Sequence, residues 1–232
     1  MRILISENVN DLAPLNKAFY KWFDNSVVKN ENGMPLIVHH GTPKGGFNTF
    51  IPSTQKKKSD YQLDFGTHFT TDKEHSKIYL TRQKRESSKP TKASQTYDCY
   101  LRIVNPLDAN KHYWREDNPE EFEKLLELTK KMFGSRFKKA YSHPDFFYNK
   151  NAQKQKEIQF LMWGHLLDHI PPSTLYNNLL QLGYDGVIYN PLMFGYNTIE
   201  KQKLAYIVLK SNQIKSIYND GSFDLNDNNI YS

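Results

Sequence analysis

The stretch Pro35-Leu36-Ile37-Val38-His39-His40-Gly41-Thr42 decides how the rest of the chain is interpreted. Apolar and β-branched residues lead into two histidines and then into Gly-Thr-Pro, where a strand has to stop. The glycine allows a ligand to come close to the backbone, and the carbonyl and N–H beside it can bond a planar amide. An ordinary strand followed by a turn explains the same octet, so its meaning depends on the sequence that follows.

Composition indicates a folded protein without disulfides. The chain has 232 residues, enough for one large domain with a buried core, and 14% of them are aromatic. A single cysteine, Cys99, excludes an internal disulfide and suits a reducing compartment. The apolar run at the N-terminus is too short for a signal peptide, and no segment approaches a membrane span. We therefore expect a cytoplasmic protein with no membrane contact.

Hydrophobic spacing predicts helices in two regions. An N-terminal helix is expected at about 11–24, with an apolar stripe that favours core packing over partner binding and consists of Leu12, Leu15, Phe19, Trp22 and Phe23. A helical insert is expected at about 115–182. Its first helix carries Phe122 to Met132 and is closed by Gly134, its second runs from Ile158 to Ile170, and its third is capped by Ser173 and ends at Gly183.

Strands are expected on both sides of the insert. Apolar and polar residues alternate from Tyr97 to Val104 in a half-buried strand, and strands return at 184–189 and 204–209. Residues 212–216 and the Asn/Asp-rich tail suggest a closing hairpin, and Gly45 to Phe50 suggests a flexible loop. The sequence thus predicts a single α+β domain over 1–232, in which strands at both ends surround the helical insert.

A second motif follows the octet. Gly66-Thr67-His68-Phe69-Thr70 is typical of a short β segment. Thr71 then caps a short helix, with Glu74 completing a capping box. Ser76 and Tyr79 are three residues apart, so they should share one face of this helix.

Four motifs in this order resemble a known family. They are the strand ending in His-Gly-Thr, the Gly-x-x-Phe-Thr … Ser-x-x-Tyr segment, Gly-Tyr-Asp-Gly-Val-Ile at 183–188, and Tyr-Ile-Val-Leu-x-x-x-Gln-Ile-Lys-Ser at 206–216. Together, over about 33–110 and 180–232, they resemble the ADP-ribosyltransferase domains of phage polyvalent and head-morphogenesis-associated proteins. These domains are relatives of the poly(ADP-ribose) polymerase and diphtheria-toxin branch. The resemblance implies a split β-sheet core and NAD as substrate.

The resemblance also implies roles for individual residues. His40 would bond the ribose of NAD, the Gly41 backbone would hold the nicotinamide carboxamide, and Thr42 would support the adenosine side. Tyr79 would stack on the nicotinamide and the Ser76 hydroxyl would bond its amide oxygen. A flat pyridinium favours an aromatic face, which agrees with these roles. His68, where the family often has tyrosine, and Phe69 would complete the pocket. As the alternative, Tyr79 is a core aromatic and His40 a satisfied core histidine.

The chain departs from the family at the catalytic acid. A glutamate just before the Tyr-Ile-Val-Leu strand would steady the oxocarbenium ion that forms as nicotinamide leaves. Here this position is Ala205, whose methyl group carries no charge. Three explanations are open. We favour a deliberate Glu→Ala change that silences a toxic enzyme, and the others are a naturally inactive chain or a contribution from Glu200.

Other signals point to different chemistry. His165-x-x-x-His169 has a helical zinc spacing but lacks an adjacent glutamate and a third ligand, so we expect no metal. Cys99 lies mid-strand without a paired histidine and is not expected to be a nucleophile. The net charge of +6 and the basic residues at 82–92, with Arg136, Lys138 and Lys139, would suit phosphates of RNA or DNA, although a solvated surface explains them equally.

The sequence therefore predicts an NAD-dependent mono-ADP-ribosyltransferase, a bacterial or phage toxin or effector. Its acceptor would be a macromolecule, with nucleic acid slightly favoured over protein, and an antitoxin or immunity protein is a further expected partner. An NAD glycohydrolase, which uses water as acceptor, and a catalytically dead module that binds NAD or nucleic acid are the alternatives.

Overall fold

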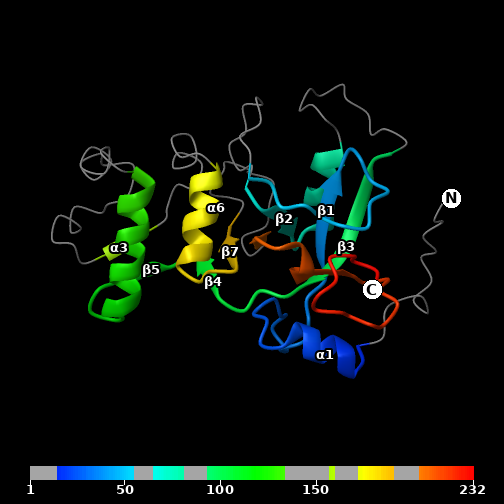
Figure 1. The fold of residues 1–232 in the computed structure, drawn as a ribbon, viewed down its shortest axis with the longest axis horizontal. Helices are drawn as coiled ribbons and strands as arrows, with labels where there is room; N and C mark the ends of the chain where they lie inside the picture. Colours follow the sequence, from blue (N-terminus) through cyan, green and yellow to red (C-terminus); the bar gives the residue numbers. More distant parts are fainter. Residues whose placement is uncertain (1–14, 55–64, 81–92, 134–156, 160–171, 191–203) are drawn as a thin grey trace. The chain divides into compact units, whose positions relative to one another are not determined.

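The computed structural model describes residues 15–54, 65–80, 93–133, 157–159, 172–190 and 204–232, and Figure 1 shows the order of its elements. The chain folds into two compact units. The first contains residues 1–51, 69–104 and 210–232, and the second contains 52–68 and 105–209. Each unit is built from separate parts of the sequence, so residues far apart in the chain become neighbours within it.

The first unit is built on antiparallel strands around β1 (Val38–Thr42). Five residue pairs join β1 to β3 (Gln95–Leu101), from Val38 with Cys99 to Thr42 with Gln95. On its other edge β1 pairs with β2 (Thr67–Thr70) through His39 and Thr70. The far edge of β3 pairs with β9 (Ile214–Ser216). β9 is therefore an edge strand of this sheet, and the closing hairpin predicted at 212–216 is wrong.

The residues after β9 are held by a buried lysine. The Lys215 ammonium donates to the main-chain oxygens of Asp227, Asn229 and Ser232, and the residue is fully buried. Burial lowers the pKa of this ammonium, although nearby aspartates act in the opposite direction. A buried charge is tolerated where several oxygens replace its water. Sequence pattern alone misses this contact because lysine is usually a surface residue.

The N-terminal helix is confirmed in part. α1 spans Lys17–Phe23, and the side chain of Asn16 caps it by accepting from the N–H of Phe19. Phe19, Trp22 and Phe23 are buried as predicted, packed with aromatic and aliphatic residues from β3 and the C-terminal segment. Leu15 precedes the cap and is 36% exposed, so its place in the predicted stripe is wrong.

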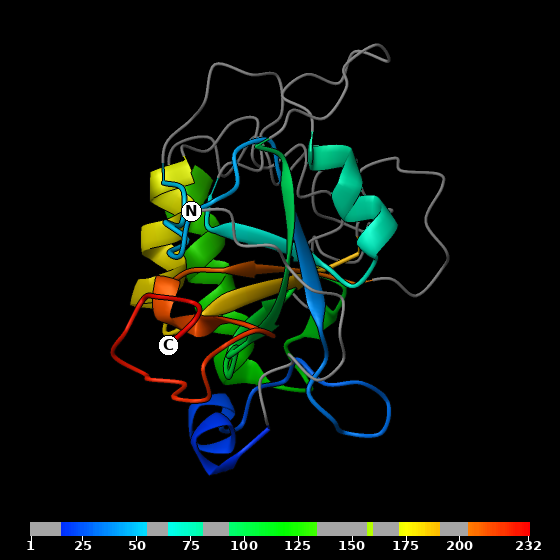
Figure 2. The ribbon, with the colours of Figure 1, turned by 90° about the vertical axis from the view of Figure 1, so that its right-hand side faces the viewer.

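A short helix lies against β1 in the first unit, as Figure 2 shows. α2 spans Lys73–Lys77 and continues into a 3-10 turn, η2 (Ile78–Leu80). Its N-cap is Asp72, whose carboxylate accepts from the N–H of Glu74, while the Thr70 hydroxyl accepts from the N–H of Asp72. The cap predicted at Thr71 is therefore wrong by one residue, because aspartate takes the position whose side chain can reach the free N–H groups.

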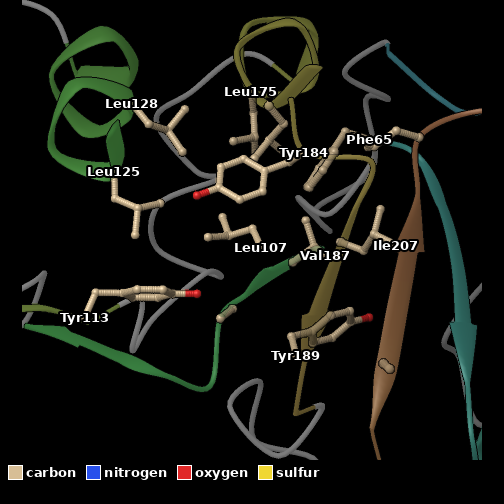
Figure 3. Close-up of a cluster of buried hydrophobic side chains, with 14 of the residues drawn as sticks. Phe65, Leu107, Tyr113, Leu125, Leu128, Leu175, Tyr184, Val187, Tyr189 and Ile207 are labelled. Carbon is tan, nitrogen blue, oxygen red and sulfur yellow. The ribbon is translucent and has the colours of Figure 1, made fainter. Parts of the chain in front are cut away.

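The second unit packs two helices on a small mixed sheet. β7 (Gly186–Tyr189) pairs in parallel with β4 (Pro106–Asp108) and antiparallel with β8 (Ala205–Val208). Helices α3 (Pro119–Phe133) and α6 (Pro172–Gln181) supply apolar side chains to its core. In Figure 3, leucines of both helices point toward Leu107, Val187 and Tyr184.

The predicted insert is only partly helical. α3 confirms its first helix, and Gly183, with φ +81°, follows α6 as predicted. Residues predicted to begin the second helix form β6 (Glu157–Gln159), which pairs with β5 (His112–Trp114), so the helical prediction at Ile158 is wrong. A short apolar run is compatible with a strand or a helix, and here pairing with β5 makes it a strand. Residues 160–170 lie outside the described residues.

The cap predicted for the third helix of the insert is also wrong. Ser173 lies inside α6, which starts at Pro172, where a fixed φ and the missing N–H suit the first helical position.

Strands and helices are mixed in both units, and the α+β prediction is confirmed. None of the helices in the described ranges is both long and apolar enough to cross a membrane.

Candidate functional site

The first unit holds six of the eight predicted site residues. They lie on β1, at the end of β2, on α2 and on η2, and are His40, Gly41, Thr42, Phe69, Ser76 and Tyr79. The other two, His68 and Ala205, belong to the second unit.

Alternation along β1 separates its residues onto two faces. His39 and Gly41 lie on the face toward α2, because a Cβ built on Gly41 would meet Ser76 and Tyr79. His40 lies on the opposite face, where it is paired with Tyr97 of β3. The neighbouring histidines of the octet thus have different surroundings, which the sequence pattern did not separate.

Gly41 is required by the packing of α2. A Cβ at this position would lie 1.8 Å from the main-chain oxygen of Ser76 and 3.4 Å from the Cβ of Tyr79. Side chains do not approach backbone this closely, so only glycine lets the helix rest on the strand here. The close approach that the sequence assigns to a ligand is thus made, on this face, by the protein's own helix.

Tyr79 presents its ring at the surface beside this contact. The residue is 42% exposed and its ring meets His75 edge-on, with centroids 5.7 Å apart. Its exposure rules out the core-aromatic alternative. Ser76, by contrast, is fully buried, and its hydroxyl donates to the carbonyl of Lys73 at 2.7 Å. Donation from Ser76 to a ligand would require this bond to break.

His40 is surrounded by aromatic rings. Its ring lies edge-on to Phe50 with centroids 5.0 Å apart, and 5.5 Å from Phe69 at a tilt of 52°. Phe50 and Phe69 are buried, while His40 is half-buried. Rigid neighbours on two sides restrict the imidazole to few orientations. A histidine that must meet one particular hydroxyl benefits from this restriction.

The loop before Phe50 is held by Tyr97, and its predicted flexibility stays a prediction. The Tyr97 hydroxyl accepts from the N–H groups of Gly46 and Phe47, at 2.9 and 3.1 Å, and donates to the carbonyl of Phe47. Burial raises the pKa of this phenol. The ring of Phe47 also stacks on Tyr97, at 4.6 Å between centroids. The glycines of this loop indicated flexibility, and the contact with Tyr97 on another strand could not be seen in the sequence.

Thr42 ends β1 in a local turn. Its hydroxyl accepts from the N–H of Lys44 at 3.3 Å, a contact typical of a Ser/Thr turn. The hydroxyl therefore lies where the strand stops, just before the loop from Gly45 to Phe50, which we call the aromatic loop. This position is compatible with the predicted contact on the adenosine side.

A charged group beside Gly41 was missed by sequence reasoning. His39 Nδ1 lies 2.7 Å from one carboxylate oxygen of Asp98, and Lys73 Nζ lies 2.8 Å from the other. Burial alone would raise the pKa of Asp98, but the hydrogen bonds and charges of His39 and Lys73 outweigh it and lower the pKa below its usual value. Pairing across strands is the only signal that could have found this group.

In the second unit His68 is held by its neighbours. One ring nitrogen, Nε2, lies 3.1 Å from the carbonyl of Phe65, and the other, Nδ1, lies 3.1 Å from the Tyr189 hydroxyl. A carbonyl only accepts, so Nε2 carries a proton and donates to it. Both ring nitrogens thus have protein partners in this structure.

Ala205 lies in the apolar core of the second unit. It is 3% exposed and opens β8 directly opposite Tyr189. Residues opposite each other in an antiparallel pair point to the same face, so the Ala205 methyl group lies beside the Tyr189 ring. Tyr189, labelled in Figure 3, was not singled out from the sequence, yet it connects position 205 to His68.

Rival sites receive little support. Cys99 is fully buried, and burial raises its thiol pKa, which is unfavourable for a nucleophile. No cluster of three metal-binding side chains occurs within the described ranges. Glu200, the His165/His169 pair and the basic residues at 82–92 and 136–139 lie outside the described residues.

Comparison with known families agrees with this arrangement. The family model "ADP-Ribosyltransferase in polyvalent proteins" matches residues 30–223, which include the octet, α2 and the strand at Ala205. The chain therefore belongs to this ADP-ribosyltransferase family, whose domains use NAD as the substrate that supplies ADP-ribose. No curated protein and no solved structure matches the chain.

Proposed function

We propose that the chain is an NAD-dependent mono-ADP-ribosyltransferase, a toxin or effector that modifies a macromolecule. The observation that carries the proposal is the packing of α2 on Gly41. It places Tyr79, a residue that is 42% exposed, so that its Cβ lies 3.4 Å from where a Cβ on Gly41 would be. An aromatic residue beside the peptide groups of a strand suits a nicotinamide ring with its carboxamide.

NAD would lie across the edge of β1. Main-chain N–H and C=O groups lie in the plane of a sheet, so a carboxamide bonded to Gly41 can be reached from both faces. Tyr79 would stack on the nicotinamide from the α2 face, where Ser76 would rotate to donate to the amide. His40 would bond the ribose from the opposite face, with Phe69 beside it, and Thr42 would contact the adenosine side.

The reaction would depend on electrostatics and positioning. The bond between nicotinamide and the ribose anomeric carbon breaks, and its electron pair leaves with nicotinamide. The acceptor then forms a new bond to the same carbon and releases a proton to solvent. Positive charge develops on the ribose between these events, which is where a carboxylate would act.

Position 205 would hold that carboxylate in an active chain. A glutamate there would extend past the Tyr189 ring, and it could accept from the Tyr189 hydroxyl by replacing His68 Nδ1, which lies 3.1 Å from that oxygen. With alanine present, we propose that the site binds NAD without efficient turnover. A deliberate Glu→Ala change remains the favoured origin over natural inactivity or help from Glu200.

The proposed acceptor is RNA or DNA rather than protein, because the chain carries a net charge of +6. A toxin of this kind needs protection in the cell that makes it, so an antitoxin or immunity protein is the proposed partner.

One experiment tests the proposal. The chain with Ala205, called the native chain below, and its Ala205→Glu variant are incubated with labelled NAD and separate pools of RNA, DNA and protein. We expect label in a macromolecule only with Ala205→Glu, at a rate at least about 100-fold above the native chain, the scale of one key electrostatic group. Ala205→Gln is the matched control, since it has the same shape without charge.

Other outcomes distinguish the alternatives. NAD loss without labelled macromolecule would identify a glycohydrolase, with water as acceptor. Binding of NAD by both forms without any turnover would identify a binding module, which the buried methyl group of Ala205 favours as second candidate. Absence of NAD binding in both forms would reject the proposal.

A further inference from the structure

Three ionisable residues connect α2 to the two central strands of the first unit. Asp98 on β3 accepts from His39 on β1 through one oxygen and from Lys73 on α2 through the other, at 2.7 and 2.8 Å. The side chains of His39 and Asp98 are only 13% and 15% exposed, whereas that of Lys73 is 53% exposed. We call this group the α2 anchor. It was not singled out from the sequence, and it lies on the same face as Gly41.

α2 needs such an anchor because it is short. A helix of five residues is far below the length at which isolated helices become stable in water. Lys73 of α2 pairs with Asp98 of β3, and Ser76 of α2 comes close to Gly41 of β1. The Gly41 contact sets how near the helix can come, while the ion pair sets where its first turn lies above β3.

The anchor also lies close to the proposed nicotinamide position. His39 and Gly41 are two residues apart on one strand, so their Cα atoms are separated by roughly 7 Å. Lys73 and Tyr79 lie at opposite ends of the α2–η2 segment. A shift of the first turn would therefore also shift Tyr79, which lies only six residues farther along this short segment.

We propose that His39, Asp98 and Lys73 are positioning residues that hold α2 over Gly41 and so keep Tyr79 in place for the nicotinamide ring of NAD. This inference rests on the proposed function and adds residues that act through Tyr79 without touching the ligand. It gives the anchor an effect on NAD affinity and leaves the chemistry at position 205 unaffected.

Two lysines of α2 provide a matched comparison. Lys73 reaches the sheet, whereas Lys77 pairs with Glu74 within the helix, and their side chains are 53% and 50% exposed. Lys73→Met removes the anchor's outer charge, and Lys77→Met removes a similarly exposed charge whose partner lies within α2. Because an exposed ion pair is worth little, we expect NAD binding to weaken only about 3- to 5-fold in Lys73→Met. Lys77→Met should bind NAD like the native chain.

The test combines calorimetric NAD titration with a second mutation. The effect of Lys73→Met should disappear when Tyr79→Ala is already present, because the anchor then has no ring to position. In the Ala205→Glu background, Lys73→Met should raise KM for NAD and leave kcat unchanged. Equal NAD affinity in Lys73→Met and Lys77→Met, or an undiminished Lys73→Met effect beside Tyr79→Ala, would overturn the proposal.

Hydrogen exchange separates failure of this inference from failure of the proposed function. Amides of residues 74–80 should exchange faster in Lys73→Met than in Lys77→Met, whether or not NAD is bound. If the native chain binds no NAD, the proposed function fails, and the exchange result alone decides whether the anchor holds α2. Unchanged exchange in Lys73→Met would overturn the anchor even in a chain that binds NAD.

Discussion

Gly41 and Ala205 are both small residues in the predicted site, but the two units use them differently. In the first unit the space at Gly41 is taken by the protein's own backbone, and polar contacts surround it. In the second unit Ala205 is one apolar side chain among many in a packed core. A change at Gly41 should therefore act by steric conflict, whereas a change at 205 should act through charge.

The difference shows which kind of contact holds the parts of each unit in place. The first unit relies on specific hydrogen bonds to place loops and a short helix, such as those of Tyr97 and Asp98. The second relies on leucines and aromatic rings from α3 and α6. Hydrogen bonds suit a binding site because polar groups have defined directions. Apolar packing mainly supplies stability.

The largest effect on stability should come from the core of the second unit. Phe122 is fully buried in α3, and Phe122→Ala should cost about 4 kcal/mol of unfolding free energy, since it removes a ring and leaves a cavity. Urea unfolding measures this cost. Lys130→Ala, on the exposed side of the same helix, is the control and should stay within about 0.5 kcal/mol of the native chain. Equal costs for the two changes would show that α3 is not packed as described.

The next effect should come from Gly41→Ala. Its methyl group would meet the Ser76 carbonyl, and relieving that overlap should cost about 3 kcal/mol and move α2. We expect NAD binding to be lost as well. Gly33→Ala is the comparison, because its Cβ meets nothing within 4 Å and only φ +75° opposes it, at about 1 kcal/mol. A Gly41→Ala protein as stable as Gly33→Ala would contradict the close contact.

A smaller effect is expected at the aromatic loop. Tyr97→Phe removes the acceptor of the Phe47 N–H and leaves the Gly46 N–H with Gln95 Oε1, which should cost about 1.5 kcal/mol. Hydrogen exchange at the Phe47 amide should become faster. Tyr20→Phe removes a hydroxyl from a residue that is 50% exposed and should be nearly neutral. Unchanged exchange at Phe47 in Tyr97→Phe would mean that the phenol does not hold the loop.

The smallest effect is a pH dependence in the first unit. The lowered pKa of Asp98 means that its carboxylate stabilises the fold above the unfolded pKa of about 3.9, and that this contribution is lost as pH falls through the folded value. Urea titrations between pH 3 and 6 should show a shallower pH dependence for Asp98→Asn than for the native chain. Parallel curves would contradict the ion pairs drawn from His39 and Lys73.

Sequence reasoning reached the fold class, the buried aromatic residues of α1, helix α3 and the family, because these depend on local pattern or on motif order. It missed contacts between distant residues. Residues at Ile158 became a strand through their pairing with β5, and the loop at Gly46 is held by Tyr97 from another strand. Residue types alone do not reveal either partner.

For the candidate site, the sequence likewise showed local features and missed distant contacts. The strand with His40 and Gly41 and the exposed ring of Tyr79 follow from the octet and the second motif. His39 and Asp98 were missed because 59 residues separate them, and their pairing exists only in the register between β1 and β3. Tyr189 was missed for the same reason, since the β7–β8 register is what brings it to position 205.

Calorimetric titration of NAD into the native chain and its Tyr79→Ala variant tests the central claim most directly. We expect the native chain to bind NAD and Tyr79→Ala to bind it at least about 10-fold more weakly, as expected for the loss of an aromatic stacking partner. Equal affinity in the two proteins would contradict a nicotinamide site between Gly41 and Tyr79.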